Sequence, residues 1–339
     1  MGVLGLLLSA GCVAPPQARL AEMRGESLVF AGAAPSPLAY PPARDVPVVL
    51  RSTYRDGPAA VLYEEGLDFE VDRARGALVR LPGSRLPDFS TNVLHGQEQF
   101  DHTKFPGYGN GPFFAYADYR PAGGVRWPVQ PSQAGRLPAT QRKLAAGGPV
   151  TIVAFGDSIT HGGEASEPAL IFWRRWADDL AAKYPRARIT SVNAATGGDT
   201  TTRGLQRLQA RVIEAKPDLV LIGFGMNDHN RRGVALPDFE GNLREMVTRL
   251  RAATAAEIVL FSTFPPNPRW VHGTHRMAEY AAATARVAAE TGCAYADVFN
   301  NWQAVAGRKR PEDLLGNNIN HPNDFGHWIY YRVFAAMEL

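Results

Sequence analysis

The chain has little cysteine, almost no surplus charge and few long apolar runs. Its 339 residues include only Cys12 and Cys293, and two cysteines cannot form a disulfide framework. Lysine and arginine number 36 and aspartate and glutamate 33, so the formal net charge is +3. Because no basic tract concentrates this charge, nothing indicates nucleic-acid binding. Beyond the N-terminus no segment is long and apolar enough to span a bilayer, so no later membrane span is expected.

The N-terminus carries a pattern that predicts the cellular location of the protein. Val3 to Leu8 is a short apolar run leading to Ser9-Ala10-Gly11-Cys12, which resembles a bacterial lipoprotein signal with Cys12 as the acylated residue. No basic residue precedes the run, and Ser9 stands where leucine is usual. We expect an exported protein, periplasmic or at the cell surface, that contacts a membrane only through a lipid anchor at Cys12. A plain secretory signal and a cytosolic chain are the alternatives.

The composition divides the remaining chain into regions. Residues 1–27 are expected to be signal and tether. Residues 28–120 are rich in proline and glycine between short β-branched and aromatic runs, which predicts a smaller all-β domain of sandwich or jelly-roll type. Within it, residues 69–81 alternate around a turn and predict a hairpin. Residues 121–148 are expected to be a linker with one short helix over 138–144.

A long loop in the β region carries several aromatic residues. Residues 97–111 contain phenylalanine and tyrosine among glycines and polar residues. Such rings can stack on sugars, but a long ordered loop packed against the next domain explains them better.

Residues 149–339 alternate strand and helix patterns. We expect strands over 150–155, 188–193, 218–224, 257–262 and 293–297, and helices over 168–183, 201–215, 238–253, 275–291 and 324–337. This order predicts an α/β domain with a parallel sheet covered on both faces. Ligands bind beyond the carboxyl ends of such strands, and Ser158 follows the first strand at a Gly-Asp-Ser turn. Ser158 is therefore placed as a nucleophile, with helix capping as the alternative.

Four short blocks in this region occur in a characteristic order. They are Gly156-Asp-Ser-Ile-Thr160, Asn193-Ala-Ala-Thr-Gly-Gly-Asp-Thr-Thr201, Gly223-Phe-Gly-Met-Asn-Asp228 and Asn318-Ile-Asn-His-Pro-Asn-Asp324. Together they resemble the four blocks of the SGNH (GDSL) hydrolase family over residues 148–339. The resemblance implies a flavodoxin-like three-layer α/β/α fold for the second domain.

The resemblance also implies roles for individual residues. Ser158 becomes the nucleophile, His321 the base, and Gly198 and Asn227 oxyanion donors. These residue types suit the roles, because a serine hydroxyl is a poor nucleophile until an imidazole takes its proton. Donors already aimed at the developing oxyanion stabilise it without reorganising. His161, three residues after Ser158, is a candidate substrate contact.

One position departs from the family pattern. The family usually has an aspartate three residues before the histidine, and here Asn318 occupies that position. Asparagine can at best orient the imidazole and cannot stabilise its cation. Three substitutes are open: an amide of Asn318 or Asn320, a backbone carbonyl that leaves a Ser-His dyad, or the carboxylate of Asp313 or Asp324. An impaired site is a fourth possibility.

The family contains lipases, lysophospholipases, thioesterases and carbohydrate esterases, so its fold does not choose a substrate. The β domain and the expected export resemble the layout of polysaccharide acetylesterases. We therefore expect a serine esterase that deacetylates a small-molecule or polysaccharide ester and needs no metal or cofactor, although His272 and His275 are weak candidate ligands. A lipid or thioester hydrolase, an acyltransferase and a catalytically weak glycan-binding protein are the alternatives. The sequence does not indicate the oligomeric state.

Overall fold

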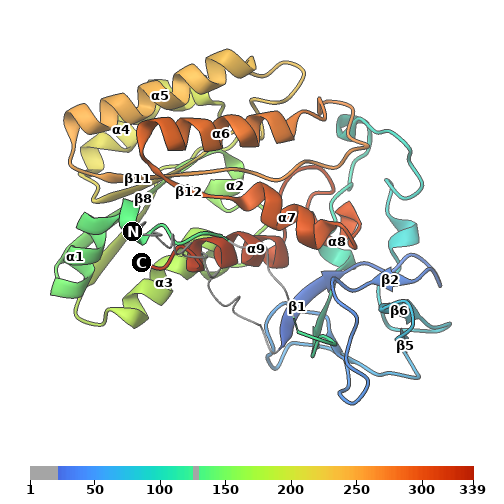
Figure 1. Cartoon of the computed structure of the whole chain (residues 1–339). Helices are drawn as coiled ribbons and strands as arrows, with labels where there is room; N and C mark the ends of the chain where they lie inside the picture. The colour runs from blue at the N-terminus through green and yellow to red at the C-terminus, as the bar shows by residue number, and fades with distance from the viewer. Residues whose placement is uncertain (1–21, 125–129) are drawn as a thin grey trace, which may run out of the picture.

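A computed structural model describes residues 22–124 and 130–339 of the chain. The predicted signal, its Cys12 and most of the tether lie outside the described residues. Figure 1 shows a parallel sheet with helices on both sides and, beside it, two small sheets formed by the N-terminal part of the chain. Among the described helices, none has the length and apolarity needed to cross a membrane.

The central sheet has five parallel strands. They are β8 (Pro149–Gly156), β9 (Arg188–Asn193), β10 (Leu219–Gly223), β11 (Glu257–Phe261) and β12 (Ala294–Ala296). Their spatial order is β12-β11-β10-β8-β9, and each neighbouring pair is parallel. This is the flavodoxin-like order, in which the first strand lies between the second and the third. The predicted fold class is confirmed, and β10 is apolar and fully buried because both faces of the sheet are covered.

Helices form the two outer layers. The described α-helices are α1 (Pro138–Ala146), α2 (Ser158–His161), α3 (Phe172–Lys183), α4 (Thr201–Arg211), α5 (Leu236–Ala253), α6 (Met277–Thr291), α7 (Val298–Ala306), α8 (Pro311–Leu314) and α9 (Asp324–Ala335). Short 3-10 turns are η1 (Phe89–Thr91), η2 (His102–Lys104), η3 (Gly111–Phe113), η4 (Ala134–Arg136), η5 (Pro168–Leu170) and η6 (Ile213–Ala215). In Figure 1, α4, α5 and α6 cover one face of the sheet, and α1, α3 and α9 cover the other.

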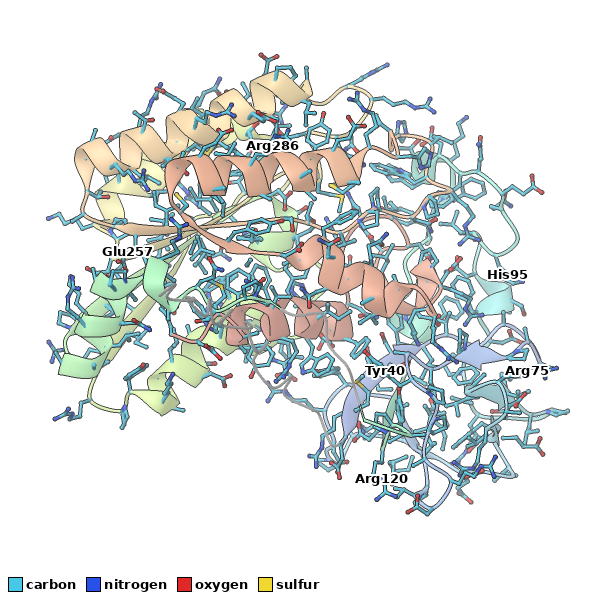
Figure 2. All side chains as sticks on the ribbon, in the orientation of Figure 1. Tyr40, Arg75, His95, Arg120, Glu257 and Arg286 are labelled. Carbon is cyan, nitrogen blue, oxygen red and sulfur yellow. The ribbon has the colours of Figure 1, made fainter. Side chains whose placement is uncertain are left out.

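The predicted linker holds a helix that is tied to the sheet. At the start of α1, the backbone N–H groups of Ala139 and Thr140 donate to the two carboxylate oxygens of Glu257, each at 2.7 Å. Glu257 begins β11 and lies beside α1 in Figure 2. A carboxylate there satisfies two N–H groups that the helix cannot and complements the positive helix end.

The N-terminal region forms two antiparallel sheets. One has the order β1 (Met23–Leu28), β7 (Ala115–Tyr119), β3 (Val49–Arg51), β4 (Leu62–Tyr63), and the other β2 (Ser36–Pro37), β6 (Ala77–Arg80), β5 (Phe69–Asp72). Strands β5 and β6 form the predicted hairpin, with Val71 opposite Leu78. Strand β1 begins at Met23, inside the stretch expected to be a tether, because Met23 is itself buried.

Both parts of the chain share one hydrophobic core. A single cluster of buried side chains includes Leu28 and Leu50 of the N-terminal sheets and Trp302 and Phe325 of the helical layer. The N-terminal sheets therefore pack directly against the end of the α/β part that contains α7, α8 and α9.

Candidate active site

Ser158 lies at the carboxyl end of β8 because the chain turns sharply there. Gly156 ends the strand, and a Cβ on it would lie 2.2 Å from the carbonyl oxygen of Gly223, so only glycine fits. Asp157 caps α2 by accepting the N–H of Ile159 at 3.0 Å. Ser158 is the first residue of α2, so its own N–H has no carbonyl one turn earlier to bind.

His321 lies in hydrogen-bond contact with this serine. The Nε2 atom of His321 is 2.7 Å from Oγ of Ser158, although 163 positions separate them. Burial lowers the pKa of His321 to about 4. The imidazole is therefore neutral near pH 7, the form that can accept a proton.

The loop 315–323, called the histidine loop below, is folded around Asn317. Its Oδ1 atom accepts the backbone N–H groups of Ile319, Asn320 and His321 at 3.0, 2.9 and 2.9 Å. The N–H of Gly316 donates to the carbonyl of His321 at 2.9 Å and closes the loop. Sequence reasoning did not find Asn317, because three of the four residues 317–320 are asparagines and nothing in the pattern distinguishes them.

The turn that carries the predicted oxyanion donor Gly198 lies close to Ser158. A Cβ on Gly197 would lie 4.0 Å from Cβ of Ser158, and the next residue, Gly198, has φ +76°, which favours glycine. Asn227 donates one amide hydrogen to the carbonyl of Asp199 at 2.9 Å. This bond fixes the amide plane and leaves the second hydrogen available. The structure thus brings Ser158 and His321 together, places the Gly197–Gly198 turn beside the serine, and ties Asn227 to that turn through Asp199.

Two buried carboxyl groups are adjacent in the sequence to site residues: Asp157 precedes Ser158 and Asp228 follows Asn227. Burial raises the pKa of Asp157 to about 7 and that of Asp228 to about 6. Asp228 accepts the N–H and the hydroxyl of Thr201 at 2.8 and 2.6 Å and the N–H of Gly225 at 3.1 Å. Since burial favours their neutral forms, these acids place less negative charge near a developing oxyanion than exposed carboxylates would.

Asn318 does not orient His321, which corrects the first of the three substitutes proposed from the sequence. Its backbone has φ +59°, and its side chain lies toward the N-terminal region. There its Nδ2 donates to the carbonyl of Tyr108 at 2.7 Å, and its Oδ1 accepts from Asn110 at 2.6 Å. Asn110 also donates to the carbonyls of Glu312 and Leu315. Asn318 therefore anchors the histidine loop to the N-terminal region.

The other side chains proposed to orient His321 also form hydrogen bonds to other residues. Asn320 accepts from Asn317, Asp313 pairs with Arg310 and accepts the N–H of Val29, and Asp324 accepts the N–H and hydroxyl of Ser166. Within residues 22–124 and 130–339, neither a carboxylate nor a carbonyl accepts a hydrogen bond from Nδ1 of His321.

These contacts predict the effect of restoring the usual family residue. Asn318→Asp should lower activity and stability, because a carboxylate in place of the amide faces the carbonyl of Tyr108 without a hydrogen to share. Leaving that buried carbonyl unpaired costs about 1–3 kcal/mol. Urea unfolding and ester hydrolysis measure the two effects, and Asn320→Asp on the same loop is the control. A gain in activity in Asn318→Asp would contradict this assignment.

The aromatic loop of the N-terminal region packs against the α/β part. Leu94 and Phe100 form one buried cluster with Trp270 and Ile319, and Phe105 and Tyr108 pack at its edge. Backbone hydrogen bonds join Phe100 to Arg269 and Val271. The expected packing role of this loop agrees with these contacts.

One group of possible metal ligands is present among the described residues. Asp101, His102 and His272 offer ligand atoms within 4.8 Å of one another. The indole N–H of Trp270 donates to Nδ1 of His102 at 3.0 Å, which places the proton of a neutral imidazole on Nε2. Asp101 also caps η2. Because two of the three ligands already serve protein contacts, we assign this group to packing between loops.

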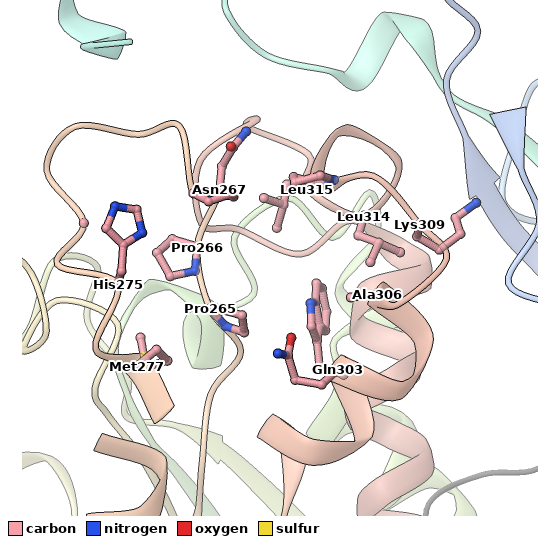
Figure 3. Close-up of a pocket in the computed structure, with 14 residues that line it drawn as sticks. Pro265, Pro266, Asn267, His275, Met277, Gln303, Ala306, Lys309, Leu314 and Leu315 are labelled. Atoms are coloured by element: carbon pink, nitrogen blue, oxygen red, sulfur yellow. The ribbon is translucent and has the colours of Figure 1, made fainter. Parts of the chain in front are cut away.

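A cavity adjoins the histidine loop (Figure 3). It has a volume of about 300 Å³ and is lined mainly by prolines, leucines, Met277 and Trp302, with His275 and Gln303 among its polar residues. Asn267 on its wall donates to the carbonyl of Asn318 at 2.8 Å. His161 is exposed at the end of α2, outside this cavity.

The chain is similar to a known enzyme family and to individual esterases. The model of the GDSL-like lipase/acylhydrolase family matches residues 154–329. Esterase TesA of Pseudomonas aeruginosa is 34% identical over 142 residues, which cover 41% of this chain and 68% of that protein. Acetylxylan esterase of Geobacillus stearothermophilus is 27% identical over 170 residues, which cover 46% of this chain and 74% of that protein.

A solved structure of a two-domain esterase active on acetylated mannans shares the fold. It superposes with a TM-score of 0.50 at 24% identity, over 60% of this chain and 54% of that chain. This chain thus matches about half the length of that esterase, and the likeness concerns the fold alone.

Proposed function

The chain belongs to the GDSL-like lipase/acylhydrolase family and is a carboxylic ester hydrolase, and from this premise we propose that it removes acetyl groups from a carbohydrate. The observation that carries the catalytic part is the 2.7 Å contact between Oγ of Ser158 and Nε2 of His321. The similarity to an acetylxylan esterase, at 27% identity, supports the acetyl-carbohydrate substrate.

The proposed reaction has two halves. Oγ of Ser158 attacks the ester carbonyl while Nε2 of His321 takes the hydroxyl proton, and the N–H groups of Ser158 and Gly198 with the amide of Asn227 bind the oxyanion. The same proton then passes to the leaving sugar oxygen, which leaves an acetyl-Ser158 ester. Water, deprotonated by His321, attacks this ester, and the imidazolium returns the proton to Oγ of Ser158 as the acyl–oxygen bond breaks, which releases acetate and restores the free serine.

Preference for acyl length tests the substrate class. We expect acetyl esters to be hydrolysed at least about tenfold more efficiently than octanoyl esters of the same alcohol, a difference of about 1.4 kcal/mol in transition-state binding. The ratio of kcat/KM for the two esters measures it, followed by acetate release from acetylated xylan and mannan. Higher efficiency on octanoyl esters, or on acyl thioesters, would instead select a lipid or thioester hydrolase.

Two further properties are proposed from the sequence. We propose that the protein is exported and lipid-anchored at Cys12, which lipid-modified N-terminal peptides in mass spectrometry would show. We also propose that the accessory domain predicted over residues 28–120 begins with β1 at Met23 and that residues 149–339 form the hydrolase domain, with 121–148 between them. Transfer of the acetyl group to a sugar hydroxyl in place of water would appear as acylated acceptor and mark an acyltransferase.

A further inference from the structure

The histidine needs a partner that the resting structure does not give it. During the proposed reaction His321 becomes an imidazolium, and a carboxylate at Nδ1 would orient and stabilise this cation. The candidate acids named from the sequence, Asp313 and Asp324, are held by other groups. The edge of the ring that carries Nδ1 faces Gly163, since a Cβ on Gly163 would lie 3.1 Å from that atom.

Glu164, the next residue, lies beside both Gly163 and the histidine loop. A Cβ on Gly316 would lie 2.5 Å from Cβ of Glu164 and 2.9 Å from its Oε2. Gly316 is in turn hydrogen-bonded to the carbonyl of His321 at 2.9 Å. The Glu164 side chain therefore runs over the loop segment that is paired with His321.

Two other features separate Glu164 from an ordinary surface glutamate. Its backbone has φ +63°, a conformation that costs a residue other than glycine about 1–3 kcal/mol and persists where surrounding structure imposes it. Its side chain is exposed at the surface, its carboxylate has no hydrogen bond or ion pair in the described part of the chain, and the neighbouring loop raises its pKa by partial desolvation. An unpaired acid held in a strained turn beside the histidine loop is free to change partner.

We propose that Glu164 is the positioning acid of His321, and that rotation of its side chain carries the carboxylate from Gly316 to the N–H at Nδ1. Neighbouring Cα atoms lie about 3.8 Å apart, so the backbone of Glu164 is one residue from the glycine that touches Nδ1. The inference rests on the proposed function, because it assigns a role within the same reaction.

Other titratable groups lie on the elements near His321, and two of them are bonded to different residues. His327 is held by the carbonyl of Gly163 at 3.1 Å, and burial lowers its pKa to about 4. Burial raises the pKa of Asp324, which is bonded to Ser166. Other charged or titratable side chains on the elements around the site include Asp157, which caps α2 and whose pKa burial raises to about 7, His161 of α2, Glu167 before α3, and Arg174 and Arg175 of α3.

Replacing Glu164 with glutamine tests the proposal. Glu164→Gln keeps the shape of the side chain and should lower kcat about tenfold to a hundredfold with little change in KM, because the imidazolium loses its counter-charge. A nearby carboxylate favours the charged imidazole, so the acid limb of the pH–rate profile should move to lower pH in the variant by about one unit. Glu167→Gln, a glutamate on the same loop that pairs with Arg55 at the surface, is the matched control.

A second variant and a second measurement distinguish failure of this inference from failure of the proposed function. Glu164→Gly removes the side chain and suits the positive φ, so it should fold at least as well and lose kcat as Glu164→Gln does. Unchanged kcat and an unchanged acid limb in both variants would overturn the inference. If the parent hydrolyses no ester, the proposed function fails, and an NMR titration of His321 still decides the inference. It is upheld if the pKa of His321 falls in Glu164→Gln and overturned if that pKa is unchanged.

Discussion

Ser158→Ala is expected to reduce kcat/KM for ester hydrolysis about 10³-fold or more, because no other group can form the acyl-enzyme ester. Among residues 22–124 and 130–339, the side chain of Ser158 makes one hydrogen bond, to His321 at 2.7 Å. Removing the hydroxyl therefore deletes the nucleophile and leaves the strand, the turn and the histidine loop without another lost contact. The melting temperature should stay close to that of the parent.

Hydrolysis of an acetyl ester and labelling by a fluorophosphonate measure this prediction independently. Parent protein should gain one phosphonyl group at Ser158, and Ser158→Ala should gain none. Ser90→Ala, at an exposed serine of the N-terminal region, is the control and should behave as the parent in both assays. Residual hydrolysis above a few per cent in Ser158→Ala would assign the nucleophile to a different residue.

The positions of Ser158, Gly198 and Asn227 could be predicted because they depend on local sequence. Each follows a strand with a strong β pattern, and parallel order brings the carboxyl ends of neighbouring strands to one edge. The carboxyl end of β8 therefore follows from the sequence once β8, β9 and β10 are placed side by side. The order of the strands in turn follows from the alternation of strands and helices together with the family pattern.

The partner of Asn318 could not be predicted, because it depends on the sign of one backbone angle. With φ +59° the side chain lies toward Tyr108 and Asn110, about 210 positions earlier in the chain. An asparagine adopts this conformation more readily than most residues, but the sequence does not show that it does so here. The same limit applies to Glu164, whose φ of +63° places it beside Gly316.

Helices α7 and α8 were not predicted from the sequence. Helix α7 begins one residue after the last predicted strand ends, with Asp297 as its cap. Helix α8 spans four residues, and four residues cannot display a helical period. Helices α7 and α8 contact the N-terminal sheets or lie next to residues that do. The elements that join the two parts of the chain were therefore not predicted from the sequence.

One of these joining contacts is a buried ion pair between Glu26 and Lys309. Both side chains are fully buried, and Nζ of Lys309 donates to Oε1 of Glu26 and to the carbonyls of Ser27 and Pro37, each at 2.9 Å. Glu26 also accepts from Tyr119 at 2.6 Å. All three hydrogens of the ammonium group are used, so the pair is compensated only while both partners are present.

Lys309→Met is therefore expected to lower the free energy of unfolding by about 3–5 kcal/mol, since it leaves the carboxylate of Glu26 buried without its cation. Urea unfolding monitored by tryptophan fluorescence measures this change. Adding Glu26→Gln to Lys309→Met should recover part of the loss, because a neutral amide costs less to bury than an unpaired carboxylate. Arg249→Met removes an exposed helix pair with Glu245 and should cost less than about 1 kcal/mol.

The same experiment shows whether the two parts of the chain unfold together. Because β1 and the segment before α8 share the ion pair and one hydrophobic core, a single transition is expected, shifted as a whole in Lys309→Met. The Asn110–Asn318 contact then makes the histidine loop depend on that packing, so ester hydrolysis should be lost at the same urea concentration as the fluorescence signal. A separate early transition of the N-terminal region, with hydrolysis retained beyond it, would show that the α/β part positions His321 without the N-terminal sheets.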